Sequence, residues 1–328
     1  MKATGKRVLV AGATGFVGAR LCRALRDEGY SVRAMTRHPD RYQGVGTPVY
    51  GDVERPESLH AALDGCESAY YLVHSLDEAD FEEREASSAR AFAAASSANG
   101  LRRIVYLGAL GDESERLSQH LRSRRAVEGL LASTGVPVTT LRAGIVVGRG
   151  GISWELTHQV VNRLPALIAP TWANTRTQPI ALDDVVRYLI GVLELPEAAS
   201  RSFDVGGSEV LTYADMVRQV ATIRGRPMPL VSVPALSLLL QPPLSGLWGA
   251  FRWLSLGLWL VTDLDTTTGV NLIKSMRNEV VMREFAIRRL VPFEPMNYKQ
   301  AVTVALDEAI EARPGQLGSS SDAGDRAS

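Results

Sequence analysis

Two residues with reactive side chains, His120 and Arg124, are spaced four positions apart in the segment SQHLRSRRAVEGLL, residues 118–131. An imidazole can give or take a proton near neutral pH, whereas a guanidinium stays charged and binds anions or hydroxyl groups without releasing its proton. Positions four apart lie on the same face of a helix, so both side chains would point at one ligand. We expect the positive charge of Arg124 to lower the pKa of His120, which favours a neutral imidazole that acts as a base.

A second histidine, His74, follows an apolar run that predicts a strand over residues 68–75. If the end of this strand faces the same cavity as His120, then His74 is a further candidate catalytic residue. Either histidine could instead be an ordinary loop or helix residue satisfied by solvent or backbone. Two histidines without a third ligand at a suitable spacing do not make a metal centre, so we expect none.

Three glycines, Gly12, Gly15 and Gly18, lie directly after a predicted strand and open a predicted helix. Glycine lets the chain turn tightly and lets a pyrophosphate approach the backbone, and the helix N-terminus offers unpaired N–H groups and a positive dipole. The strand–turn–helix context supports this interpretation of the glycine pattern. We therefore expect a dinucleotide to bind at this loop, which also contains Thr14, Phe16 and Val17.

Strand-like and helix-like segments alternate along the chain. Short apolar runs typical of buried parallel strands cover residues 7–12, 31–37, 68–75, 102–110, 137–148 and 201–207. Helical patterns cover residues 18–29, 56–65, 83–100, 121–135 and most of 179–196. This alternation predicts an α/β fold with a doubly wound parallel sheet, the Rossmann fold, in which ligands bind at the carboxyl ends of the strands.

Five segments together resemble motifs of the extended and atypical short-chain dehydrogenase/reductase superfamily. They are GATGFVG (12–18), GDV (51–53), LRAGIVVG (141–148), PIALDDVVRYL (179–189) and FDVGGSEVLTYADM (203–216). The chain resembles in particular the NmrA-like branch, which also includes the nucleotide-binding accessory subunit of respiratory complex I. The resemblance extends to about residue 312 and implies an NAD(P)-binding protein.

The same resemblance shows where the chain departs from the superfamily's catalytic set of Ser, Tyr and Lys. His120 stands where the superfamily has its proton-donating Tyr, and Arg124 where it has the Lys that holds the nicotinamide ribose; Glu128 occupies the place of a common later acid. Gly108 and Ala109 stand where the Ser is expected. The spacing is kept and the chemistry is changed, with Arg124 expected to anchor the ribose and His120 to act as acid or base.

The end of the second predicted strand favours NADP(H) over NAD(H). A carboxylate there would bind the ribose 2′-hydroxyl of NAD, whereas an arginine suits the 2′-phosphate of NADP. The sequence has Thr36 and Arg37 at this position, with Arg33 and Arg41 nearby. Asp40 could still reach a ribose, so NAD(H) stays possible.

Three further residues complete the expected cofactor contacts. The resemblance implies that Asp52 and Val53 lie against the adenine, although Asp52 could instead cap the strand end. Val73, beside His74, is expected near the nicotinamide ribose.

The motifs predict two lobes and a tail. We expect residues 1–149 to form the NAD(P)-binding domain, with 179–206 returning to it. Residues 150–178 and 207–312 are expected to form a smaller, mostly C-terminal substrate lobe. Residues 313–328, rich in glycine, serine and aspartate, are expected to be a disordered tail.

The composition is that of an ordinary globular protein, because 45% of the 328 residues are hydrophobic and 22% are charged. Lys and Arg together number 36, as do Asp and Glu, so no net field favours nucleic acid. The two cysteines, Cys22 and Cys66, argue against a disulfide scaffold and for a reducing compartment, so we expect a cytoplasmic protein.

One strongly apolar segment, residues 244–261, carries Trp248, Trp253 and Trp259 around a single charge, Arg252. That charge argues against a membrane span. The segment could pack in a core, line a pocket for an apolar substrate, or make a peripheral membrane or protein contact.

Two functions are consistent with these observations. The first is an NADP(H)-dependent oxidoreductase, or an epimerase, acting on a small apolar or amphipathic carbonyl compound. The second is a non-catalytic dinucleotide-binding protein, either a redox sensor or an assembly subunit. The altered catalytic set favours the second, whereas the titratable pair at the kept spacing favours the first.

Overall fold

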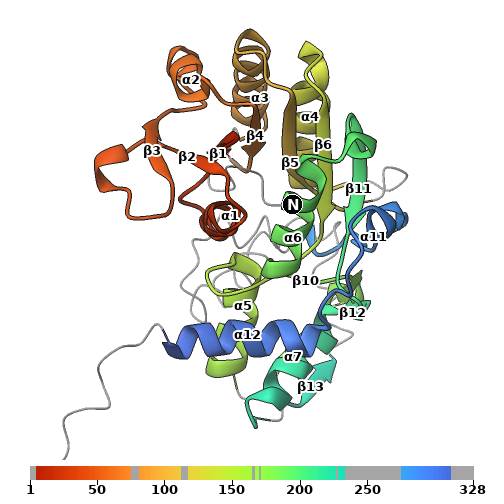
Figure 1. The fold of residues 1–328 in the computed structure, drawn as a ribbon. Helices are drawn as coiled ribbons and strands as arrows, with labels where there is room; N and C mark the ends of the chain where they lie inside the picture. Colours follow the sequence, from red (N-terminus) through yellow and green to blue (C-terminus); the bar gives the residue numbers. More distant parts are fainter. Residues whose placement is uncertain are drawn as a thin grey trace, which may run out of the picture.

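The computed structural model describes residues 5–74, 81–111, 117–164, 167–169, 171–226, 228–232 and 275–311 of the 328-residue chain. A parallel sheet dominates the fold, with seven strands in the order β11-β6-β5-β4-β1-β2-β3 (Figure 1). The strands are β1 (Arg7–Ala11), β2 (Ser31–Thr36), β3 (Thr47–Tyr50), β4 (Ser68–Tyr71), β5 (Arg103–Ala109), β6 (Val138–Ala143) and β11 (Arg201–Val205).

The strand order reverses between β1 and β4. The chain moves outward from β1 through β2 to β3, then crosses back to β4 and continues in the other direction. This crossing leaves a crevice at the carboxyl ends of the two central strands, which is where open α/β sheets bind ligands. The α/β prediction with a doubly wound parallel sheet is confirmed.

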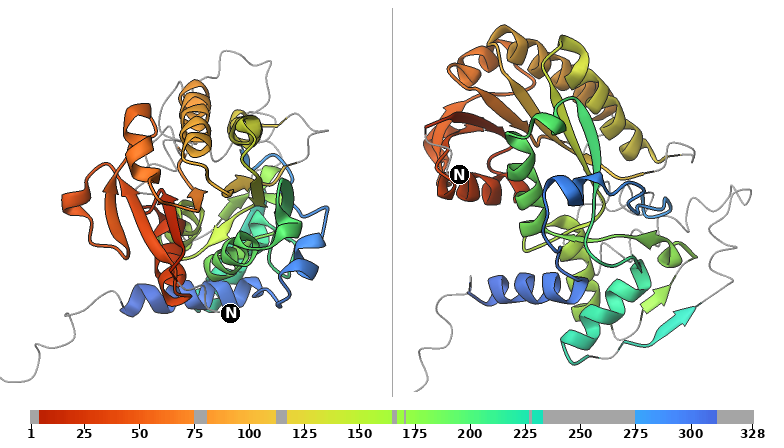
Figure 2. Two further views of the ribbon diagram at one scale, coloured as in Figure 1. Left: turned by 45° about the horizontal axis from the view of Figure 1, so that its top comes forward. Right: turned by 45° about the vertical axis from the view of Figure 1, so that its right-hand side comes forward.

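Both faces of the sheet are covered by helices, as the side-chain alternation of a strand requires. Val8 and Val10 of β1 pack into one buried cluster, and Leu9 and Ala11 pack into another on the opposite face. Figure 2 shows the two layers of helices on either side of the strands. The first face is covered by α1 (Phe16–Asp27) and α6 (Leu182–Leu193), and the second by α2 (Pro56–Leu63), α3 (Phe81–Ala98) and α4 (Gln119–Leu131).

A smaller lobe lies below the sheet in Figure 1 and has a core of its own. Trp154, Met216, Val220 and Val302 are buried together there. The helices of this lobe are α5 (Ile152–Arg163), α7 (Tyr213–Ile223) and α12 (Tyr298–Glu311), while the short α11 (Ala286–Leu290) lies against β11. Three short strand pairs join this part of the chain: β7 (Val146–Val147) with β10 (Ile180–Ala181), β9 (Arg176–Thr177) with β12 (Leu211–Thr212), and β8 (Leu167–Ala169) with β13 (Leu230–Ser232).

Some predicted element boundaries differ from the structure, and some predicted segments lie outside the described residues. The predicted strand over 137–148 is two strands, β6 and β7, and the predicted strand over 68–75 ends at Tyr71. The apolar segment 244–261 and the expected tail 313–328 lie outside the described residues. Within the described part of the chain, no helix combines the length and apolar character needed to cross a bilayer.

Candidate functional site

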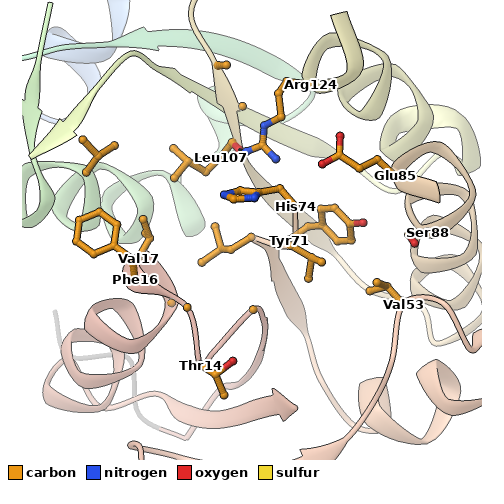
Figure 3. Close-up of a pocket in the computed structure, with 18 of the residues that line it drawn as sticks. Thr14, Phe16, Val17, Val53, Tyr71, His74, Glu85, Ser88, Leu107 and Arg124 are labelled. Carbon is orange, nitrogen blue, oxygen red and sulfur yellow. Dashed lines mark hydrogen bonds between the residues drawn. The ribbon is translucent and has the colours of Figure 1, made fainter. Parts of the chain in front are cut away.

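A cavity of about 640 Å³ opens at the carboxyl ends of the sheet strands (Figure 3). Its lining begins with Gly12 after β1, Arg37 after β2 and Asp52 after β3, and continues to Leu107 in β5 and Arg124 in α4. Its volume lies within the range of small-molecule and cofactor sites. Every cofactor-binding and catalytic residue predicted from the sequence lines this one cavity. They are Gly12, Thr14, Gly15, Phe16, Val17, Gly18, Arg37, Asp52, Val53, Val73, His74, His120 and Arg124.

The three glycines of the loop are required for different reasons. Gly12 has a φ of +89°, and a Cβ there would meet the backbone of Leu72 at 3.0 Å. A Cβ on Gly18 would overlap the carbonyl group of Gly12, so the close passage of α1 over the loop demands glycine. A Cβ on Gly15 would meet only the Gly12 oxygen, at 3.2 Å, so here the missing side chain chiefly keeps the cavity open.

The N-terminus of α1 points its free donors into this space. Gly15 is the N-cap, and no side chain of the described residues caps the helix. The first N–H groups of an α-helix have no partner within the helix, and together with its dipole they bind phosphate groups. The backbone of the loop therefore fits a dinucleotide pyrophosphate without help from a charged side chain.

The basic residues predicted near the end of β2 differ in whether they line the cavity. Arg37 is exposed and lines the cavity. Arg33 instead donates hydrogen bonds to the carbonyl oxygens of Ala61 and Asp64, at 3.1 and 3.2 Å, and is engaged at the end of α2. Neither Arg41 nor Asp40 is among the lining residues, so Arg37 is the charged residue of this strand end that faces the cavity.

The turn after β3 supplies Asp52 and Val53. Asp52 Oδ1 accepts a hydrogen bond from the N–H of Glu54 at 3.0 Å, and the Asp52 N–H donates to Ser58 Oγ at 2.9 Å. The carboxylate thus shapes its own turn while it lines the cavity. One of its oxygens remains available for a ligand, so capping and binding are compatible here.

Helix α3 contributes three lining residues that the sequence interpretation missed: Arg84, Glu85 and Ser88. Arg84 forms an ion pair with Glu54 across the cavity wall. Glu85 is only 6% exposed and accepts a hydrogen bond from the hydroxyl of Ser123. Their spacing places all three on one helical face, but only the packing of α3 against α4 shows which face it is.

Arg124 is held at the other end of the cavity and is 7% exposed. Its Nη2 donates a 2.5 Å hydrogen bond to the carbonyl oxygen of Leu107, and its guanidinium lies 5.2 Å from the ring centre of Tyr106. Its Nη1 is buried and has no hydrogen-bond partner among the described residues. A buried guanidinium with a free donor is costly unless a ligand completes it.

His120 lies one helical turn from Arg124 and faces the same cavity. Burial, followed by the charge of Arg124 and then by His74, lowers the pKa of His120 to about 3. The direction agrees with the expected effect of Arg124, but the larger cause is desolvation, which the sequence alone does not reveal. The imidazole is therefore neutral at physiological pH, rather than titrating near neutrality.

His74 lies in the loop that follows β4, three residues beyond Tyr71, and is exposed. Figure 3 shows its ring and the Arg124 guanidinium in the same part of the cavity. Among the described residues, no group of three or more His, Cys, Asp or Glu side chains could hold a metal ion.

Two further positions of the superfamily's pattern, 128 and 108, hold residues whose contacts are structural. Glu128 accepts two hydrogen bonds from Arg142, at 2.8 and 3.1 Å, and another from Ser202, so it ties α4 to β6 and β11. It is not among the residues that line the cavity. A Cβ on Gly108 would lie 3.2 Å from both Thr140 and the ring of Tyr106, so a serine there would require its neighbours to move.

Comparisons with known proteins relate this chain to NAD(P)H-binding proteins. A family described as NAD(P)H-binding matches residues 12–162. The (4-alkanoyl-5-oxo-2,5-dihydrofuran-3-yl)methyl phosphate reductase of Streptomyces griseus is 27% identical over 67% of this chain and 75% of its own length. The ceramide reductase of Caulobacter vibrioides is 26% identical over 74% of this chain and 78% of its own. The photosystem II assembly factor Ycf39 of Cyanophora paradoxa is 26% identical over 69% and 71%, respectively.

Solved structures show the same fold at lower identity. A UDP-glucose 4-epimerase from Thermotoga maritima superposes with a TM-score of 0.68 at 14% identity, covering 93% of this chain and 99% of its own. An NADPH-dependent quinone oxidoreductase from Escherichia coli superposes with a TM-score of 0.65 at 16% identity, covering 90% and 98%. The similar proteins thus include reductases and an assembly factor, and the solved structures show the same fold as this chain.

Proposed function

We propose that this chain, which is similar to NAD(P)H-binding proteins and to reductases, is an NADP(H)-dependent oxidoreductase acting on a small apolar or amphipathic carbonyl compound. The observation that carries this proposal is the single cavity, which joins the glycine loop and Arg37 to His120 and Arg124. An epimerase that keeps its cofactor tightly bound would need the same residues.

The dinucleotide would be held mainly by backbone. The N-terminus of α1 takes the pyrophosphate, and Asp52 and Val53 lie against the adenine. Arg37 takes the 2′-phosphate, because a guanidinium matches phosphate oxygens with two parallel hydrogen bonds. Asp40, the residue that would have favoured NAD(H), is not among the residues that line the cavity.

The other end of the cavity would hold the nicotinamide and the substrate. The bound cofactor supplies or removes a hydride. Arg124 presents two N–H hydrogens on Nη1, so one can bind a ribose hydroxyl while the charge stays beside the reacting carbonyl. His120 and His74 border the same space, and a neutral imidazole can donate one hydrogen bond and accept another.

Two measurements test the proposal in sequence. Fluorescence titration with NADPH and NADH should show binding of both, with NADPH bound more tightly. Oxidation of NADPH is then followed in the presence of quinones, enals and steroid-like ketones. Tight NADPH binding with no oxidation by any member of this panel would reject the catalytic part of the proposal.

A non-catalytic redox sensor or assembly subunit is the second candidate. It is favoured by the absence of the Ser, Tyr and Lys of the superfamily from positions 108, 120 and 124. The similarity to a photosystem II assembly factor also favours it. In that case, NADPH and NADP⁺ should produce different protease-cleavage patterns of the protein, and the His120→Ala variant should bind both as the wild type does.

A further inference from the structure

Two polar groups at the catalytic end of the cavity lack partners among the described residues. Arg124 is more than nine-tenths buried, and its Nη1 has no hydrogen-bond partner there. His120 is only partly buried as a residue, but its Nδ1 atom is buried and also lacks a partner among the described residues, and both side chains line the cavity. Buried polar atoms are nearly always satisfied, so two orphans one helical turn apart point to a ligand with an acceptor atom between them.

One acidic residue, Glu85, lines the same end of the cavity as the Arg124 guanidinium (Figure 3). Glu85 lies on the α3 side of the same group, where the hydroxyl of Ser123 donates to it. The Nη1 hydrogens of Arg124, which have no partner among the described residues, are therefore available to an anion.

Strong proton donors are missing from this end of the cavity, within the described residues. His120 is neutral because its pKa is lowered to about 3, and a guanidinium does not release its proton. Tyr71 lines the cavity, but burial raises its pKa and its hydroxyl points toward α3 (Figure 3). Reduction of an isolated ketone leaves a strongly basic alkoxide, which needs a proton at once. Reduction of a conjugated carbonyl leaves a delocalised enolate or phenolate, which needs only a positive charge beside it.

We propose, building on the oxidoreductase function above, that Arg124 and His120 form an oxyanion site, and that the substrates are conjugated carbonyl compounds such as enones or quinones rather than isolated ketones. For an enone, the C–H bond at the hydride donor would break and a C–H bond would form at the β-carbon; the C=C π pair becomes the π bond between the α-carbon and the carbonyl carbon, and the C=O π pair moves onto the oxygen. Arg124 Nη1 and the neutral imidazole hold that oxygen while water protonates the α-carbon. The hydroxide left by that water is neutralised by a solvent proton, so the reduction consumes one hydride, supplied by the reduced dinucleotide, and one proton.

A stable phenolate tests the oxyanion site without turnover. 4-Nitrophenol is titrated into the protein saturated with NADP⁺, and the absorbance of its yellow anion reports the protonation state of the bound molecule. We expect the wild type to bind the anion preferentially and to lower the pKa of the bound phenol. Arg124→Gln should weaken binding of the anion roughly ten- to a hundred-fold, as expected for loss of a charge-assisted hydrogen bond. Arg124→Lys should restore part of it.

Arg125→Gln is the matched control. It removes the same charge from the next position of α4, where the side chain donates to the carbonyl oxygen of Gly111 and does not line the cavity. This variant should bind nitrophenolate like the wild type. Equal binding by the Arg124→Gln variant and the wild type, or a preference for the neutral phenol, would overturn the oxyanion site. Saturation with NADP⁺ is verified for each variant, so that a folding or cofactor defect is not mistaken for this result.

Activity on matched substrates separates this inference from the proposed function. With NADPH, an enone should be reduced at least a hundred-fold more efficiently than its saturated ketone, as measured by kcat/KM. Equal or better reduction of the saturated ketone overturns the inference and leaves the oxidoreductase function standing. Arg124-dependent binding of nitrophenolate without any NADPH oxidation has the opposite meaning: the oxyanion site stands and the oxidoreductase function fails.

Discussion

The two ends of the cavity are built on different principles. At the glycine-loop end, the groups offered to a ligand are mainly backbone, from the glycine loop and the uncapped N-terminus of α1. At the α4 end, the groups offered to a ligand are side chains, and two of their polar atoms have no hydrogen-bond partner among the described residues. A site made from backbone leaves a glycine pattern that is easy to recognise, because few other residues fit. A site made from side chains can keep its spacing while its chemistry changes, so the motif alone does not reveal the reaction.

The largest effect is expected from removal of the imidazole. His120→Ala should lower turnover about 10²–10⁴-fold, because the substrate loses a hydrogen bond next to the reacting atoms. The affinity for NADPH should change little, since the pyrophosphate and adenine contacts lie at the other end. Steady-state kinetics and fluorescence titration on the same preparation separate the two quantities. Equal losses in turnover and in NADPH affinity would mean that the two ends of the cavity are not independent.

A loss of NADPH affinity is expected from substitution in the glycine loop. Gly15→Val would place a branched side chain where the pyrophosphate approaches α1, so NADPH affinity should fall at least about a hundred-fold. A Cβ at Gly15 would meet only one backbone atom, at 3.2 Å, so the fold should survive. Circular dichroism and thermal unfolding serve as the control. Unchanged NADPH affinity in a folded variant would contradict the assignment of the loop.

A smaller and more selective effect is expected at the end of β2. Arg37→Ala should weaken NADPH about ten- to a hundred-fold, the usual cost of one charge-assisted phosphate contact, and leave NADH nearly unchanged. Arg33→Ala is the matched control, because this arginine is bound to carbonyl oxygens of the α2 segment. If both nucleotides weaken equally in the Arg37 variant, that residue does not select the 2′-phosphate.

A stability effect without a binding effect is expected further along α4. Glu128→Gln should lower the free energy of unfolding by about 1–2 kcal/mol, because the partly buried Arg142 loses its two charge-assisted hydrogen bonds. Denaturant unfolding measures this change. NADPH affinity should stay at the wild-type value, since Glu128 lies outside the cavity lining. A large loss of NADPH affinity in this variant would show instead that Glu128 contributes to the binding site.

The smallest effect concerns pH. The folded-state pKa of His120 is lowered to about 3, below the ordinary value of 6.5, so the unfolded chain binds a proton more readily between these values. His120 therefore costs stability as the pH falls below its ordinary pKa, an effect of roughly 1 kcal/mol or more near pH 4.5. His120→Phe lacks this titration. Its stability relative to the wild type should rise between pH 7.5 and pH 4.5, and a constant difference would show that His120 is not buried as described.

The sequence predicted those parts of the site that depend on local geometry. The spacing of Gly12, Gly15 and Gly18 after an apolar strand specifies the loop, and the i, i+4 spacing places His120 and Arg124 on one face. It did not predict the roles of Arg84, Glu85 and Ser88, because helix α3 carries no motif and its cavity-facing side depends on packing against α4.

By itself, the sequence determined the alternation of strands and helices and the residues of the glycine loop, because each depends on patterns within a few tens of residues. The tertiary structure decided what depends on distant segments meeting. Arg37 lines the cavity and Arg33 does not, because the Arg33 guanidinium donates hydrogen bonds to carbonyl oxygens at the end of α2. The tertiary structure also buried His120 deeply enough to keep the imidazole neutral, because desolvation depends on how much of the surrounding protein excludes water, and no spacing along the chain records that.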